Sequence, residues 1–161
     1  MWQDLIETLD KLGETYDKLA TLGEKKRNAL VVINMKGLAN ILDEEQLLAA
    51  KIQKLEKRRV ELLKGLSEAN TGVDAQTKAT DFYKLAPSRE MASKLLQAHE
   101  RLSKNVDRAV AIRDNNKILA QCALDAVQNK LNKIGGATVE PTYSGKGAGI
   151  VTHQKNFDFK A

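Results

Sequence analysis

The sequence predicts an all-α protein: an antiparallel hairpin of two long helices, completed to a three-helix coiled-coil-like bundle by a third long helix. Apolar residues alternate steps of three and four through residues 2–33 and again through 38–66, which is the spacing of a coiled-coil seam. The composition agrees, because 42% hydrophobic and 29% charged residues with only 4% aromatic ones are typical of long helices with thin aliphatic cores.

The hairpin is expected to consist of helices over about residues 2–33 and 37–67, each about 48 Å long or slightly less at 1.5 Å per residue. The first seam contains Trp2, Leu5, Leu9, Leu12, Tyr16, Leu19, Gly23, Lys26, Leu30 and Ile33. The second contains Leu38, Ile41, Glu45, Leu48, Ile52, Leu55, Arg59, Leu62 and Leu66, and is widened for a third helix by Leu42, Ala49 and Leu63. Residues 34–37 are short and turn-compatible, so the two helices are expected to run antiparallel.

The register of this hairpin follows from its turn. If the chain reverses near Met35 and Lys36, the numbers of facing positions sum to about 71 in an antiparallel coiled coil. Lys26, the basic seam residue of the first helix, then faces Glu45, the acidic seam residue of the second. We interpret the two as a structural seam pair, because a part-buried ion pair can fix register even where it adds little stability.

A short helix is expected at about residues 75–85, with Asp74 as its N-cap. Its apolar side chains Phe82, Tyr83 and Leu85 are expected to pack back against the open end of the hairpin.

The third long helix is expected over about residues 88–133. Pro87 and Ser88 suit a helix start, and Gly135 with Gly136 suits its end. Towards its end the apolar residues cover more than one face, which the hairpin alone cannot bury. This surplus surface comprises Ile118, Leu119, Cys122, Ala123, Leu124, Ala126, Val127, Leu131 and Ile134.

Residues 1–134 are therefore predicted to form the helical bundle, and residues 135–161 a flexible tail. The tail holds five of the ten glycines, and it has too few apolar residues to offset the entropy of ordering. Aromatic side chains spaced along such a segment suit docking onto a partner.

The charge distribution argues against a nucleic-acid interface. The net charge is +5, but residues 1–70 hold 12 basic and 12 acidic residues. The excess falls on the third helix, where basic and acidic residues alternate, whereas nucleic-acid-binding proteins concentrate basic residues in a patch. The runs 25–27 and 57–59 are interpreted as solvated helix surface.

Other sequence features favour a cytoplasmic protein that does not insert into a membrane. No apolar run is long enough to span a bilayer. The N-terminus lacks the basic and apolar blocks of a signal peptide, and a lone cysteine cannot form an internal disulfide.

No catalytic or metal-binding constellation is present in the sequence, so no enzyme activity, metal or cofactor is expected. His99 and His153 have no ligand-like spacing, and Cys122 is interpreted as a small buried hydrophobic residue. Residues 145–149 lack the strand and helix that flank a phosphate-binding loop.

The order of these parts resembles the FlgN family of bacterial flagellar export chaperones. The most specific segments are Asn116 to Leu119 in the third helix and Glu140-Pro141-Thr142-Tyr143-Ser144-Gly145-Lys146-Gly147 in the tail. The resemblance covers nearly the whole chain. It implies a cytoplasmic chaperone that binds hook-filament junction proteins, prevents their premature assembly and delivers them to the export gate.

The resemblance also implies which residues act. The client-binding surface would comprise Ile118, Leu119, Cys122, Ala126, Val127, Leu131 and Ile134, and Tyr143 with Gly145 and Gly147 would dock at the gate. Two alternatives stay open: a structural coiled-coil protein that self-associates, for example as a homodimer, and, less favoured, a helical nucleic-acid-binding protein.

Overall fold

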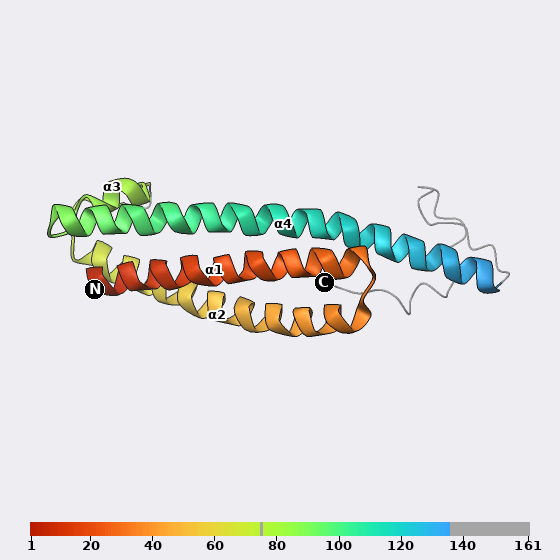
Figure 1. Ribbon diagram of the computed structural model, residues 1–161. Coiled ribbons are helices and arrows are strands. Elements are labelled where there is room, and N and C mark those ends of the chain that lie inside the picture. Colours follow the sequence, from red (N-terminus) through yellow and green to blue (C-terminus); the bar gives the residue numbers. More distant parts are fainter. Residues whose placement is uncertain (75, 136–161) are drawn as a thin grey trace. The chain divides into compact units, whose positions relative to one another are not determined.

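The computed structural model describes residues 1–74 and 76–135, and within these ranges the protein is helical, with no strand. It contains α1 (Trp2–Val31), α2 (Met35–Glu68), the short α3 (Ala79–Tyr83) and α4 (Arg89–Gly135), as Figure 1 shows. The all-α prediction is confirmed, and the three long helices pack against each other as a bundle.

The chain divides into two compact units, Met1–Gln121 and Cys122–Ala161. The first unit contains the hairpin of α1 and α2, the short α3 and the part of α4 that packs on them. In the second unit, the described residues 122–135 belong to the last part of α4.

In the first unit, side-chain contacts between residues far apart in the sequence show the relative directions of the helices. The ion pair of Lys26 with Glu45 joins α1 to the antiparallel α2. Between α1 and α4 the residue numbers of contacting pairs rise together, from Asp10 with Arg101 to Gly23 with Asn116, so these two helices run parallel. Helix α1 therefore lies between two partners of opposite direction.

The hydrophobic core lies at the end of the first unit that holds the N-terminus. It comprises Leu5, Ile6, Leu9, Leu12, Leu62, Leu66, Phe82, Tyr83, Leu95, Ala98 and Leu102. The α3 aromatics close this end as expected, since the ring of Phe82 lies 5.3 Å from that of Trp2 and Tyr83 is only 1% exposed. Leu85 departs from the prediction, because it is 45% exposed.

Helix α2 is less covered than its sequence suggested. Its buried residues are Leu62 and Leu66, both in its last two turns. The widening residues Leu42 and Ala49 are exposed, and only Leu63 packs against the core. The prediction that this whole broader face receives a third helix is wrong, because α4 lies along α1 for most of its length in this unit.

The turn between α1 and α2 lies two residues earlier than expected. Helix α1 ends at Val31, and Ile33 has a φ of 52°, a left-handed conformation that ends a helix. The amide of Asn34 then donates to the carbonyl of Ala29 over 2.9 Å. The side chain of Asn34 accepts from the amide of Gly37 over 3.0 Å, so α2 begins at residue 35 rather than 37.

The N-cap of α3 differs from the sequence prediction, whereas that of α4 agrees with it. The N-cap of α3 is Lys78, not Asp74, because Asp74 Oδ1 accepts from the amide of Gln76 over 2.9 Å in the preceding turn. At the start of α4, Ser88 Oγ accepts from the amide of Met91 over 3.1 Å, as the sequence predicts for an N-cap.

Candidate binding surfaces

The last part of α4 presents a stripe of large apolar side chains, which we call the α4 seam. It consists of Leu124, Val127, Leu131 and Ile134, with exposed fractions of 47%, 40%, 48% and 74%. The steps of three, four and three residues between them are those of a coiled-coil seam. The stripe is therefore shaped to pack against another helix.

The remaining residues predicted for this surface lie elsewhere on α4. Cys122 and Ala126 are exposed but occupy a different face from the α4 seam at about 100° per residue. Ile118, 65% exposed, and the half-buried Leu119 belong to the first unit. The interpretation of Cys122 as a buried residue is wrong, because its side chain is exposed although Ala120 and Ala123 beside it are half-buried.

Leu124 was not among the residues expected to bind the client, although the spacing of apolar residues around it indicates that role. Leu124 lies three residues before Val127, which continues the alternation of steps through Leu131. The expected docking residues Tyr143, Gly145 and Gly147 lie outside the described residues, and so does the rest of the expected flexible tail.

The seam pair of the hairpin has the geometry that its register predicts. Lys26 Nζ lies 2.9 Å from Glu45 Oε2 and 3.3 Å from Glu45 Oε1. The two side chains are 24% and 23% exposed, so water screens the pair only in part.

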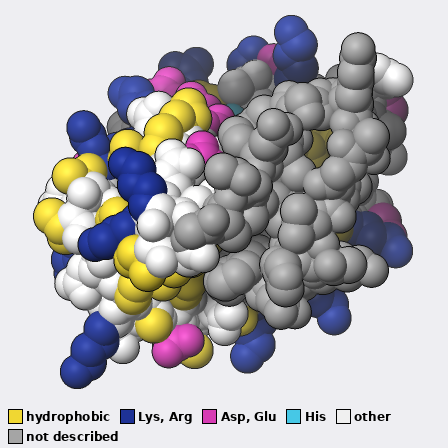
Figure 2. Space-filling view, turned by 90° about the vertical axis from the view of Figure 1, so that its right-hand side faces the viewer, with side chains coloured by type: hydrophobic (Ala, Val, Ile, Leu, Met, Phe, Trp, Pro, Cys, Tyr) yellow, Lys and Arg dark blue, Asp and Glu magenta, His cyan; other side chains and the backbone are white. Residues whose placement is uncertain are grey.

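A second apolar surface lies at the turn of the hairpin, and we call it the hairpin tip. It consists of Val31, Val32, Ile33 and Met35, with exposed fractions of 65%, 72%, 39% and 67%. Figure 2 looks at the molecule from the side on which this turn lies in Figure 1. In the coloured part of that view, hydrophobic and basic side chains adjoin one another.

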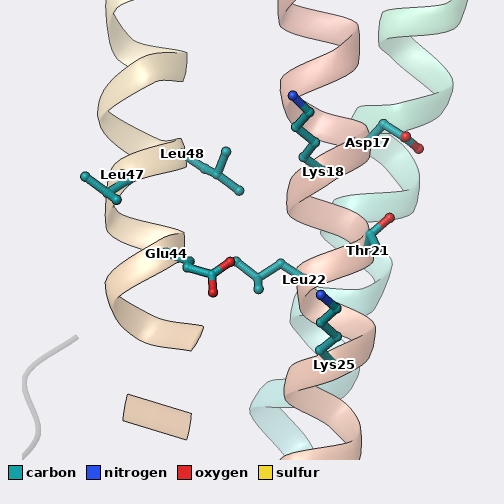
Figure 3. A pocket seen from close by; sticks show the side chains of 8 residues that line it. All are labelled: Asp17, Lys18, Thr21, Leu22, Lys25, Glu44, Leu47 and Leu48. Carbon is teal, nitrogen blue, oxygen red and sulfur yellow. The ribbon is translucent and has the colours of Figure 1, made fainter. Parts of the chain in front are cut away.

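An open groove of about 410 Å³ lies between α1 and α2 (Figure 3). Leu22 of α1 and Leu48 of α2 each point into the space between the two helices, and Glu44 reaches toward Leu22. Lys18 and Lys25 of α1 also line the groove. This apolar floor with a rim of mixed charge can accept side chains of a partner. It lacks the enclosed shape and converging polar groups of a small-molecule site.

The titratable groups show no arrangement for catalysis. Within the part of the chain that the structure describes, no three His, Cys, Asp or Glu side chains are close enough to hold a metal. His99 is half-buried, and its Nδ1 lies 3.2 Å from the hydroxyl of Tyr83. Burial raises the pKa of Tyr83, so this buried phenol stays neutral and serves packing.

Basic residues on α4 are matched by acids on α1. Arg108 lies 3.0 Å from both Asp17 and Glu24, and Arg101 pairs with Asp10. The hydrogen bond that Arg108 donates to the carboxylate of Glu24 is the main reason why the pKa of Arg108 is raised. These pairs neutralise part of the positive excess on α4, which weakens the nucleic-acid alternative.

None of the described helices is long and apolar enough to cross a membrane. A family model described as FlgN protein matches residues 1–149, which is most of the chain. No curated protein and no solved structure matches the sequence. Because this match extends over residues 1–149, the chain belongs to the FlgN family.

Proposed function

We propose that this protein is a cytoplasmic chaperone for hook-filament junction proteins, which it keeps from assembling early and delivers to the flagellar export gate. Membership of the FlgN family gives the general role of a flagellar export chaperone. The observation that carries the finer proposal is the α4 seam, because its four large apolar side chains are exposed at coiled-coil spacing.

The α4 seam suits a client that offers an amphipathic helix. Residues 124 to 134 extend about 15 Å along a helix at 1.5 Å per residue, enough for three turns of a partner helix. Covering such a stripe buries a few hundred Å² of apolar surface. At about 25 cal/mol per Å² this supplies several kcal/mol, from which the cost of association is subtracted. The resulting affinity is moderate, as reversible delivery requires.

The other predicted client contacts form a separate set in this proposal. Cys122 and Ala126 lie on another face of α4, and Ile118 and Leu119 lie in the first unit. They contribute where a client covers more than one face of the helix. Substituting them tests that contribution independently of Val127, Leu131 and Ile134.

The deciding experiment substitutes one residue of the α4 seam. Leu131 is 48% exposed, so Leu131→Asp is expected to preserve helicity and melting temperature. The same change places a charge in the client interface and is expected to weaken binding of purified junction proteins at least about tenfold. Asn129→Asp is the matched control, since Asn129 is exposed on the opposite face of the same turns. Loss of the fold in Leu131→Asp, or unchanged client binding, would contradict the proposal.

Light scattering during size-exclusion chromatography separates a client-binding chaperone from a structural coiled coil. The chaperone proposal expects a complex with the junction protein that Leu131→Asp disrupts. A stable homodimer that ignores junction proteins and dissociates in Leu131→Asp would instead show that the α4 seam serves self-association.

Delivery is proposed to depend on Tyr143, with Gly145 and Gly147 beside it. Tyr143→Ala is expected to leave client binding unchanged and to lower export of the client in cells. Tyr143→Phe is the conservative control and should retain export if the aromatic ring makes the contact. Weakened client binding in Tyr143→Ala would assign this residue to the client surface instead.

A further inference from the structure

The hairpin tip combines exposed apolar side chains with local strain. Four large apolar residues occur within five positions, and three of them are more than 60% exposed. Ile33 adopts a φ of 52°, which is unfavourable for a β-branched residue and is usually left to glycine. Glycine or a polar residue at this position would avoid the backbone strain and the exposure of apolar surface. The apolar Ile33 is therefore kept at some cost to the stability of the fold.

The tip is held in place by its own hydrogen bonds. The amide of Asn34 donates to the carbonyl of Ala29, and the side chain of Asn34 accepts from the amide of Gly37. Ala29 and Leu30 immediately before the turn are buried. The apolar side chains are thus presented by a hydrogen-bonded turn next to buried residues.

The charges within residues 25–42, which contain the turn, have one sign. Residues 25–42 contain four basic residues and no acidic one. Lys26 is paired with Glu45, whereas Lys25, Arg27 and Lys36 are exposed. The first acid after the turn is Asp43, about 12 Å behind Met35 at 1.5 Å per residue. Along their own helices, Lys25, Arg27 and Lys36 thus lie nearer the apolar end than the first acids, Glu24 and Asp43.

We propose that the hairpin tip docks on the surface of an anionic lipid bilayer. Val31, Val32, Ile33 and Met35 would enter the interface between headgroups and acyl chains, where Lys25, Arg27 and Lys36 reach the lipid phosphates. The contact is peripheral, in keeping with described helices that are too polar to cross a membrane. This proposal is independent of client binding by the α4 seam.

A second copy of the chain fits the tip less well. Two facing tips would bring basic groups against basic groups, which is unfavourable. The exposed apolar area of the tip is a few hundred Å², below the roughly 800 Å² per partner of a stable protein interface. A bilayer needs neither that area nor a complementary shape, and its negative charge matches Lys25, Arg27 and Lys36.

The proposal is tested by flotation of the full-length protein with phosphatidylcholine vesicles, with or without about one third phosphatidylglycerol. Wild-type protein is expected to float with the anionic vesicles and not with the neutral ones, and to be released by high salt. Val32→Ser and Met35→Ser should each reduce the bound fraction several-fold. Arg27→Gln and Lys36→Gln should each lower the partition coefficient for the anionic vesicles about fivefold, as expected for one charge near the surface.

Matched controls distinguish binding through the hairpin tip from non-specific adsorption to the vesicles. Leu47 on α2 is 72% exposed, like Val32, and lies away from the turn, so Leu47→Ser should bind as wild type. Lys57→Gln provides the same control for charge. Absence of binding to anionic vesicles, equal binding to neutral ones, or an equal effect of Leu47→Ser would overturn the proposal. So would a wild-type dimer in solution that Val32→Ser converts to a monomer.

Discussion

The side-chain amide of Asn116 in α4 donates a hydrogen bond to the backbone carbonyl of Gly23 in α1 over 2.7 Å. A similar bond joins Asn105 to the carbonyl of Gly13 over 2.9 Å, so two asparagines on α4 meet two glycines on α1. Because glycine has no side chain, the helices approach closely and the carbonyl stays within reach. The two contacts fix the axial position of α4 on α1 at two separate points of their shared interface.

Removing the Asn116 contact should destabilise the bundle. Asn116 is 4% exposed, and its Oδ1 accepts no hydrogen bond within the described residues. Asn116→Ala is therefore expected to lower the free energy of unfolding by about 1–2 kcal/mol, near the typical value of one buried hydrogen bond. Urea denaturation measures this change. The exposed neighbour Asn115 is the control: Asn115→Ala should be neutral or slightly stabilising, because alanine favours the helix. A loss of equal size in Asn115→Ala would show that the effect does not come from the contact with Gly23.

The two glycines should respond oppositely to alanine. A Cβ on Gly23 would lie 2.6 Å from Ile112 Cγ2, whereas one on Gly13 would lie 3.7 Å or more from its neighbours. Gly13→Ala is expected to stabilise the protein by about 0.5–1 kcal/mol through helix propensity. In Gly23→Ala the clash with Ile112 should outweigh the gain in helix propensity. The net effect should be a destabilisation of the protein by about 1–2 kcal/mol.

Thermal unfolding of the two glycine variants compares them directly. Ile112→Ala in the Gly23→Ala background removes the clashing methyl and should relieve the effect of the added Cβ. Stabilisation by Gly23→Ala alone would show that the α1–α4 interface is looser than its geometry indicates.

The pair of Lys26 and Glu45 should be energetically coupled. A double-mutant cycle with Lys26→Ala and Glu45→Ala is expected to give a coupling of about 0.5–1 kcal/mol, since the pair is only partly screened. Lys26→Leu should leave the hairpin folded but allow its register or oligomeric state to vary, which cross-linking and light scattering detect. A coupling indistinguishable from zero would remove the proposed role in register.

Tyr83 should make the protein sensitive to alkaline pH. Burial, partly opposed by nearby Arg59, raises the pKa of its phenol above 10.0 in the folded state. The unfolded phenol ionises first, so the stability from this group is complete below about pH 10 and is lost as pH rises through the folded pKa. Tyr83→Phe should lose about 1 kcal/mol at neutral pH, because it removes the contact with His99.

Melting temperatures measured from pH 8 to 11 test the Tyr83 prediction. The decline above pH 10 should be shallower in Tyr83→Phe than in wild type. Parallel declines in the two proteins would assign the alkaline sensitivity to other groups.

The sequence predicted the hairpin well because its information is local. Steps of three and four residues determine which side of each helix faces its neighbour, and an antiparallel turn then fixes the register that pairs Lys26 with Glu45. The surplus of apolar residues late in the third helix likewise predicted exposed apolar side chains, and Val127, Leu131 and Ile134 are exposed. The surface identity of Cys122 was missed because apolar neighbours indicate burial only where another element covers them.

The α1–α4 interface was not predictable in this way. Asn116 and Gly23 are separated by more than 90 residues, and neither has the apolar character by which core positions are recognised. Gly23 was assigned to the seam facing α2, whereas its nearest neighbours include Ile112 of α4. Close packing through glycine depends on the position of the partner helix, and a single sequence pattern does not contain that information.

The uneven burial of α2 has a consequence for the local unfolding of the hairpin. Because its buried residues, Leu62 and Leu66, lie at one end, the other end is held mainly by the half-buried seam and the Lys26–Glu45 pair. Backbone amides in the first half of α2 should exchange with deuterium sooner than those of α1. Opening can then begin at the turn and stop before the core, so one helix supplies both a stable anchor and a segment that unfolds locally.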